Sequence, residues 1–429
     1  MTIYPAHVSW TPPPQEQSTR EERTLRRKKR AGANFRINKA LVSAETPEEI
    51  LVQVAGSIRY FNFVNLSTAL YRLALVAQPL TQIHKAHVRS DPRLFALLME
   101  LTDTLSIDAE ADCSDDLVLP PKELSNVVWA ATKLGINDPA MFDQVQAHVI
   151  KHVDTFDSVN LSLTLWGLAK MDIKSPDVFR VAEGRIEQLL YEFEPHRICN
   201  AVWAFAKAGF ATERFFLVIA DECTRKLNKF NHSNESMLLY AYALGGVHAP
   251  LLFQRMMARQ IPVIKSREVA DPRSLSNLLW AMAELQLQNI YGEAIEAIGQ
   301  SAVENIHRYS LTHMATLCSA FAKASVRNDP LFELISRECE TREGVNDPAC
   351  LADLTKLKES LAAFGFKSDL VSEQVVKLTS LEQQTKVETS VKEESKWVKV
   401  AWDLLGTTLV AICVIVVASL VKKYFAIKA

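Results

Sequence analysis

The chain of 429 residues has little glycine, no paired cysteines and almost no net charge. Its 13 glycines are too few for the many turns of an all-β protein, so helices are expected. The seven cysteines include no Cys-x-x-Cys pair, which is typical of scattered structural thiols in a reducing compartment. Because the formal net charge is −2, any nucleic-acid contact must come from a local patch.

Motifs of catalysis and metal binding are also missing. The sequence has no glycine-rich phosphate loop, no Gly-x-Ser-x-Gly and no His-Glu-x-x-His. His148 and His152 are spaced for one helix face, but Val149 stands where a zinc protease has its glutamate, and no third ligand is evident. We therefore predict no enzyme, no catalytic residue, no cofactor and no metal site.

One stretch, LSNVVWAATKLG at Leu124–Gly135, recurs through the chain. Its aromatic residue returns in steps of 37–40 residues, at Trp129, Trp166, Trp203, Tyr240 and Trp280. Weaker copies have Tyr71, Ser319 and Glu359 at the same position. Self-similarity at this period predicts an array of repeats.

Each repeat has a second half that starts a new helix. Asp91-Pro92, Asp138-Pro139 and Ser175-Pro176 each precede an apolar run that contains Phe. A capping Asp or Ser before a proline is typical of a helix start. Gly135, Gly209 and Gly246 follow the preceding helices, where glycine adopts a positive φ at little cost. We predict an all-α fold, an α-solenoid of about eight helix-turn-helix repeats over residues 46–380.

The repeat resembles a known signature. PPKELSNVVWAATKLGI (Pro120–Ile136) and PHRICNAVWAFAKAGF (Pro195–Phe210) resemble octotricopeptide repeats, with their proline, apolar doublet, Trp-Ala and Ala-Lys-x-Gly. The array also resembles the helical region of FAST-kinase-like and RAP-domain proteins, although no RAP module follows it. The resemblance implies a helical-repeat RNA-binding protein of mitochondria or chloroplasts that acts in RNA processing, stability or translation.

Two positions beside the Trp share one helix face. With the Trp as position zero, positions −3 and +4 are seven residues apart and point within about 20° of each other. Lysines at +4 contact phosphates well, and Asn or Thr at −3 can hydrogen-bond one base per repeat. The candidate RNA-binding residues are Asn126, Lys133, Lys170, Asn200, Lys207, Asn277, Thr316 and Lys323.

The two rows are interrupted, so other interpretations stay open. Leu163 and Met237 break the −3 row, and Glu284 breaks the +4 row. The same face could also be a protein-binding groove. It could instead be a solvated surface without a ligand, on which the lysines only stabilise the C-terminal ends of their helices. We interpret the Trp itself as a core residue because Val127 and Val128 are its neighbours.

The N-terminal part is predicted to be a disordered basic arm over residues 1–45. From Glu16 to Lys39 it has nine Lys or Arg and three Glu. The arm is compatible with an RNA or phospholipid contact, a nuclear signal at Leu25–Arg30, or organelle targeting. An acidic, lysine-free segment near residues 103–118 predicts an exposed loop between the first two repeats.

The C-terminal part contains an uncharged stretch of 18 residues, Leu404–Val421. As a helix it would span about 27 Å, which nearly matches a bilayer core. We predict a transmembrane helix at 404–421, after a polar linker at 381–403 and before a short basic tail at 422–429. A buried soluble helix is the alternative. A tail anchor of this kind predicts that the protein is located at a mitochondrial membrane, with a plastid or endoplasmic reticulum membrane as alternatives.

Together these features predict a membrane-anchored helical-repeat protein that binds RNA in an organelle. The expected partners are RNA, the membrane through residues 404–421, and the ribosome or other proteins on the solenoid groove. The rival hypothesis is a tail-anchored α-solenoid scaffold that binds proteins through the same face.

Overall fold

The computed structural model describes residues 20–80, 82–110, 119–266, 271–341, 350–366, 369, 371–381 and 383. The regular structure of these residues is helical throughout, without a strand, which confirms the all-α prediction for this part of the chain. The chain divides into two compact units, Met1–Met256 (unit 1) and Met257–Ala429 (unit 2). Each unit is described by itself below.

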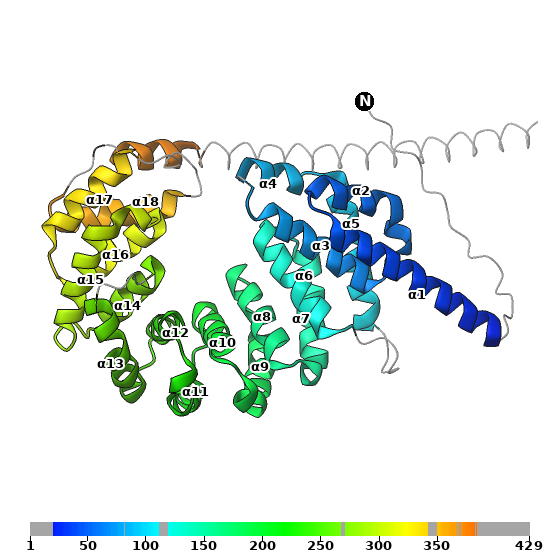
Figure 1. The fold of residues 1–429 in the computed structure, drawn as a ribbon, viewed down its shortest axis with the longest axis horizontal. Coiled ribbons are helices and arrows are strands. Elements are labelled where there is room, and N and C mark those ends of the chain that lie inside the picture. The colour runs from blue at the N-terminus through cyan, green and yellow to red at the C-terminus, as the bar shows by residue number, and fades with distance from the viewer. Residues whose placement is uncertain are drawn as a thin grey trace, which may run out of the picture. The chain divides into compact units, whose positions relative to one another are not determined.

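Unit 1 consists of helix pairs in two layers (Figure 1). Its first helices, which carry the repeated aromatic residue, are α3 (Phe63–Ala77), α6 (Pro121–Leu134), α8 (Ser158–Lys170), α10 (Pro195–Ala208) and α12 (His232–Leu244). Its second helices are α5 (Pro92–Glu110), α7 (Pro139–His152), α9 (Pro176–Leu189) and α11 (Glu213–Arg225), with the short α4 (Gln82–Arg89) between α3 and α5. Each first helix packs against the next, and α5, α7 and α9 pack in the same order.

The core of unit 1 lies between these layers. Phe205 of α10 contacts Phe179 of α9 and Phe215 of α11, with ring centroids 5.0 and 4.7 Å apart. All three rings are almost fully buried. One hairpin cannot enclose such rings, so the stack of neighbouring hairpins supplies the core, as expected for a solenoid.

Unit 2 repeats the arrangement. Its first helices are α14 (Pro272–Glu284), α16 (Leu311–Ala324) and α18 (Leu351–Ala363), which pack one against the next. Its second helices are α15 (Gly292–Asn305) and α17 (Asp329–Thr341), and residues 371–381 are helical. The boundary between the units falls inside α13 (Pro250–Ser266). The eight predicted copies of the aromatic position thus lie on eight helices of the described residues.

Short 3-10 turns lead from the second helix of one repeat to the next first helix. They are η1 (Ile58–Tyr60), η2 (Val153–Thr155), η3 (Leu190–Glu192), η4 (Leu227–Lys229) and η5 (Ile306–Arg308). After η3 comes the buried Phe193, and Lys226 Nζ donates to the carbonyls of Leu190 and Phe193 at 3.1 and 3.2 Å. This lysine therefore ties the end of its own second helix, α11, to the preceding turn.

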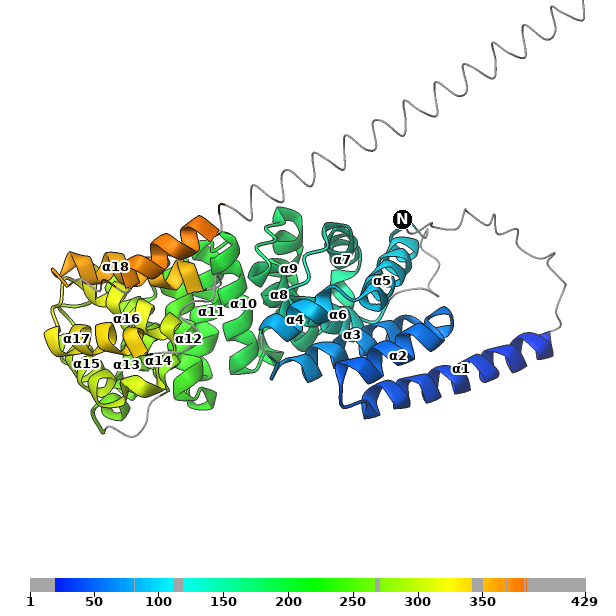
Figure 2. The same ribbon diagram turned by 90° about the horizontal axis from the view of Figure 1, so that it is seen from above.

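Two predicted loops are partly helical. The predicted disordered arm at 1–45 contains α1 (Arg20–Ser43), which lies beside α2 (Pro47–Ser57) and α3 (Figure 2). Leu41 of α1 is fully buried, and the Asn65 side-chain amide of α3 donates to the Asn34 carbonyl at 3.1 Å. The helix formers in the basic segment and this packing explain the difference. In the predicted acidic loop at 103–118, α5 continues to Glu110.

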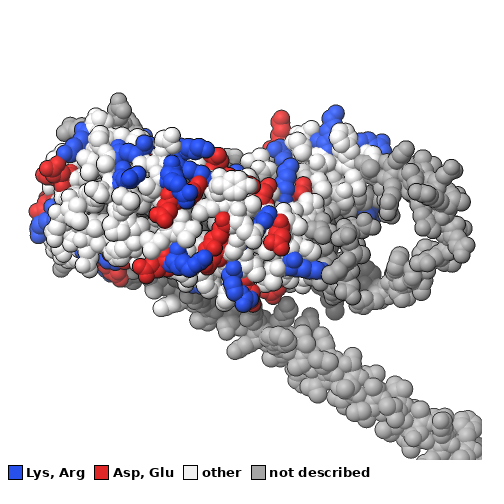
Figure 3. Space-filling model, turned by 90° about the horizontal axis from the view of Figure 1, so that it is seen from below, with Lys and Arg blue, Asp and Glu red and all other residues white. Residues whose placement is uncertain are grey.

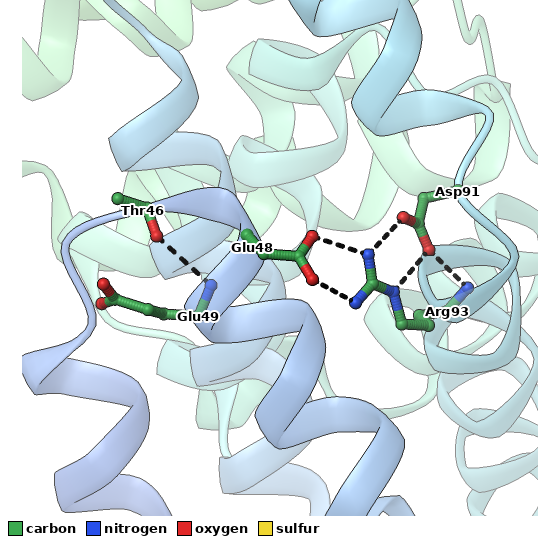
Figure 4. Close-up of polar contacts among 5 residues, drawn as sticks. All are labelled: Thr46, Glu48, Glu49, Asp91 and Arg93. Atoms are coloured by element: carbon green, nitrogen blue, oxygen red, sulfur yellow. Dashed lines mark hydrogen bonds and ion pairs between the residues drawn. The ribbon is translucent and has the colours of Figure 1, made fainter.

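A charged cluster connects α2 to the start of α5 (Figure 4). Arg93 donates to both carboxylate oxygens of Glu48, at 2.7 and 2.8 Å, and to both of Asp91, at 2.9 and 2.7 Å. Hydrogen bonds from Arg93 lower the pKa of the Glu48 and Asp91 carboxyls. In the same view, the Thr46 hydroxyl accepts from the backbone of the first turn of α2 and caps that helix.

The membrane prediction falls outside the described part of the chain. Among the described residues, no helix combines the length and apolar character needed to cross a membrane. The predicted span at 404–421 and the tail at 422–429 lie outside them, as does most of the linker predicted at 381–403, of which only residues 381 and 383 are described, both as helix.

Most first helices are followed by a residue in the left-handed conformation. Gly135, Gly209 and Gly246 have φ of 67°, 85° and 67°, which confirms their predicted role. At the matching place in α8, α14 and α16, Asp172, Gln286 and Ser325 adopt φ of 59°, 56° and 54° without being glycine. A side chain is disfavoured in this conformation, so these three helix ends are strained.

The first helices approach each other closely at α8. A Cβ atom added to Gly167 would lie 2.4 Å from Val128 Cγ1 of α6. Glycine is therefore needed at this position because the neighbouring helix occupies the space of any side chain.

We predict that Gly209→Ala and Gly184→Ala change stability in opposite directions. A Cβ at either site meets no atom within 4 Å, so backbone conformation alone decides. Gly209→Ala should cost about 1 kcal/mol because φ is positive. Gly184→Ala, inside α9, should stabilise by up to about 1 kcal/mol. Thermal unfolding checks both, and equal shifts would contradict the assignment.

Gln286→Gly should raise the melting temperature of unit 2, because glycine removes the left-handed strain. The expected gain is up to about 1 kcal/mol, partly offset by the greater freedom of glycine in the unfolded chain. Gln286 is exposed, so little packing is lost. A clear loss of stability would show that the glutamine side chain itself holds the helix end.

Candidate functional site

The repeated Trp is not a core residue, so this interpretation was wrong. Trp129, Trp166 and Trp203 are half-buried, while their sequence neighbours Val128 and Val202 are fully buried. The physical reason is helix geometry. At 100° per residue, the Trp lies about 60° from position −3 and about 40° from position +4, on the face they share. The Asn–Trp–Lys stripe denotes positions −3, 0 and +4 of the first helices.

Three indole N–H groups of the stripe in unit 1 are free to donate a hydrogen bond. Among the described residues, the N–H groups of Trp129, Trp166 and Trp203 donate no hydrogen bond. A buried indole normally finds an acceptor, whereas a half-exposed ring with a free donor is typical of a binding surface.

Rings and ammonium groups of adjacent repeats meet along the stripe. The rings of Tyr71 on α3 and Trp129 on α6 lie with centroids 4.9 Å apart. Lys133 Nζ lies 5.7 Å from the Trp129 ring centroid and 5.3 Å from that of Trp166 on α8. Both distances are within the range of cation–π attraction. Lys133 therefore links two repeats, and successive stripe positions lie side by side.

The asparagines at position −3 have unpaired amides. Asn126 and Asn200 are half-buried, and their side chains form no hydrogen bond within the described residues. Asparagines at other positions of the first helices behave differently. Asn160 accepts from the Ser125 hydroxyl at 3.2 Å, and Asn65 takes part in a capping box. A ligand can therefore use both the donor and the acceptor of Asn126 and Asn200.

The lysines at position +4 of unit 1 carry uncompensated charge. Lys133, Lys170 and Lys207 are exposed, and none has an acidic partner within 4.0 Å among the described residues. Three such lysines in successive repeats make a local basic row in a chain whose net charge is −2. The row is suited to the phosphates of a nucleic-acid backbone.

Charges elsewhere are more often paired. Arg214 of α11 forms ion pairs with Glu183 and Glu187 of α9, at 3.2 and 2.6 Å. Lys265 pairs with Glu293 at 2.6 Å. On the face drawn in Figure 3, basic and acidic side chains lie interspersed in the same way. Such surfaces have little attraction for a polyanion.

The predicted residues of unit 2 are in a different environment. Lys323 forms an ion pair with Glu284, which occupies position +4 of the preceding first helix. The Thr316 hydroxyl donates to the Thr312 carbonyl of its own helix at 2.8 Å. Asn277 is half-buried and forms no side-chain hydrogen bond among the described residues. Unit 2 therefore keeps one free amide but offers no unpaired lysine at position +4 within its described residues.

One further lysine of unit 2 belongs to the stripe. Lys356 occupies position −3 of α18 and is half-buried. Burial lowers the pKa of its ammonium, and the nearby Asp353 carboxylate acts in the opposite direction.

Within the described residues, no group of three or more His, Cys, Asp or Glu is placed to hold a metal ion.

We predict that Trp203→Ala destabilises unit 1 less than Phe205→Ala does. Both residues belong to α10, but Phe205 is buried in the ring cluster and Trp203 is half-exposed. Removing a buried Phe typically costs about 3–5 kcal/mol, and the loss at Trp203 should stay below about 2 kcal/mol. Thermal unfolding of the two variants measures this difference. A larger loss at Trp203 would restore the core interpretation.

Comparison with known proteins gives one finding that bears on this site. A family model described as RNA-editing substrate-binding complex 6 protein matches residues 91–289, slightly less than half of the chain. The matched residues include α6, α8, α10 and α12 of unit 1, with their share of the stripe. No curated protein matches the chain. The chain is thus a helical-repeat protein whose central part is similar to a family named for its place in an RNA-editing complex.

Proposed function

We propose that this chain binds single-stranded RNA through the Asn–Trp–Lys stripe of unit 1. The observation that carries the proposal is the row of three unpaired lysines, Lys133, Lys170 and Lys207, in register with half-exposed indole rings. A basic track with aromatic rings is how proteins hold single strands, because phosphates meet the cations and bases stack on the rings. Paired bases of a duplex would leave the rings unused.

The family similarity supports the same proposal. The matched family is named as a protein of an RNA-editing substrate-binding complex, and the match covers four stripe repeats of unit 1. On this basis we propose that the chain works inside an RNA–protein assembly rather than alone. Its role there would be to hold an RNA strand for processing, stabilisation or translation by other components.

We predict that Lys170→Gln combined with Lys207→Gln weakens RNA binding and its dependence on salt. Each phosphate contact to a single strand contributes about 0.7 to the slope of log affinity against log salt concentration. The double variant should therefore lower the slope by about 1.4, as measured by fluorescence anisotropy of a labelled single-stranded RNA with the full chain.

Two single variants serve as controls for this measurement. Lys229→Gln removes an exposed lysine of η4, outside the stripe, and should leave the slope unchanged. Lys323→Gln removes a lysine already paired with Glu284 and should have a smaller effect than Lys207→Gln. A uniform effect of all lysine variants would indicate nonspecific attraction and would contradict the proposed row.

A protein-binding function is the second candidate, favoured by the apolar members of the stripe. Leu163 and Met237 are half-buried beside the Trp row, and exposed Trp rings are frequent hot spots of protein interfaces. If wild-type protein retains no RNA at low salt, while Trp203→Ala releases a protein partner from the purified assembly, this candidate replaces the RNA proposal.

We also propose that residues 404–421 anchor the chain in a mitochondrial membrane, with plastid or endoplasmic reticulum membranes as alternatives. The support is the uncharged run of 18 residues followed by Lys422 and Lys423. Alkaline extraction of membranes should retain the full chain in the pellet and release a variant with Ile415→Asp and Val417→Lys. Recovery of both proteins in the supernatant would contradict anchoring, and fractionation with organelle markers identifies the membrane.

A further inference from the structure

Position −3 of the stripe alternates in chemical character along unit 1. From α6 to α12 it is occupied by Asn126, Leu163, Asn200 and Met237. All four side chains are half-buried on the same face of their helices. The two amides have no hydrogen-bond partner within the described residues, as shown above.

The two kinds of side chain differ in what they can recognise. A primary amide presents a donor and an acceptor side by side, so it can form two hydrogen bonds to one base edge. Asn pairs in this way with the N6 and N7 atoms of adenine. Leu and Met pack against a base but form no hydrogen bond with it. An amide therefore selects a base, and an apolar side chain accepts any base.

The row of cations does not share this alternation. Position +4 is Lys in α6, α8 and α10, at Lys133, Lys170 and Lys207. These helices pack directly against each other, and Lys133 reaches the ring of Trp166 in the next repeat. A strand that follows this row meets a cation and a ring at every repeat, but a hydrogen-bonding side chain only at every second repeat.

We propose that unit 1 reads single-stranded RNA at alternate nucleotides. Asn126 and Asn200 each hydrogen-bond one base, and the base between them stacks near Trp166 and Leu163 without being identified. Because both readers are asparagines at equivalent positions, the two identified bases are the same, and Asn chemistry indicates adenine. One nucleotide per repeat is the spacing that other helical RNA readers use. The inference rests on the proposed function of the stripe.

The test is selection of RNA from a random single-stranded library with the full chain, followed by sequencing. The expected motif is adenine, any base, adenine. Asn200→Ala should remove the preference at one of the two positions, and Leu163→Asn should add a preference at the middle position. Direct binding should then show that a mismatch at an identified position lowers affinity about tenfold in wild type and has no effect in the matching variant.

Each outcome separates the inference from the function on which it rests. If wild-type protein binds RNA but selects adjacent bases, two bases that differ from each other, or no motif, the alternating readout is wrong and RNA binding stands. Another base selected at both positions would support the spacing and identify a different base edge. If wild-type protein selects no RNA, the proposed function itself fails. Circular dichroism and thermal unfolding of Asn200→Ala, compared with wild type, show whether the variant is folded.

Discussion

The rest of the structure depends on the packing of each first helix between its two neighbours. A single hairpin of this length cannot enclose rings such as Phe179, Phe205 and Phe215, so every repeat in the middle of a unit completes the core of the next. The same packing fixes the rotation of the helices about their own axes. The face that does not enter the core is then presented in the same register by successive repeats, which is how one helix position becomes a continuous row.

In this arrangement one face of each first helix packs in the core and the opposite side, which carries the stripe, faces solvent. Val128 and Val202 are sealed in the core, whereas Trp129 and Trp203, one residue later, reach solvent. We therefore expect the scaffold to tolerate changes in the stripe, because the fully buried residues lie on the other face of these helices. The units use this freedom differently. Among the described residues, unit 1 leaves its stripe lysines Lys133, Lys170 and Lys207 without an acidic partner, whereas unit 2 pairs Lys323 with Glu284 of the adjacent repeat.

Much of the fold was predictable, because repetition marks equivalent positions without any knowledge of their surroundings. The eight copies and the proline-bearing helix starts follow from the period. Three of the glycine helix ends follow in the same way. Helix ends at Gln286 and Ser325 were not predictable from residue type, since neither is glycine. The prediction that the basic arm is disordered was wrong for α1. It relied on the high charge of the segment, which gives no sign that Leu41 is buried.

The sequence identified two of the three positions of the candidate site and assigned the third, the Trp, to the wrong environment. The stripe positions −3 and +4 were found by helix geometry, but the Trp between them was assigned to the core from its apolar neighbours. The same calculation places the Trp on the stripe. Ion pairing between repeats, as in Glu284 and Lys323, depends on contacts across 39 residues and leaves no local signal. The free amides of Asn126 and Asn200 could be recognised only once their surroundings were known.

Gly167, directly after Trp166, has a wider consequence. The other Trp helices have Ala at this place, whereas α6 leaves no room for a Cβ atom on α8. The repeats are therefore not interchangeable, because a repeat with Ala here would fit beside α6 only if the two helices moved apart.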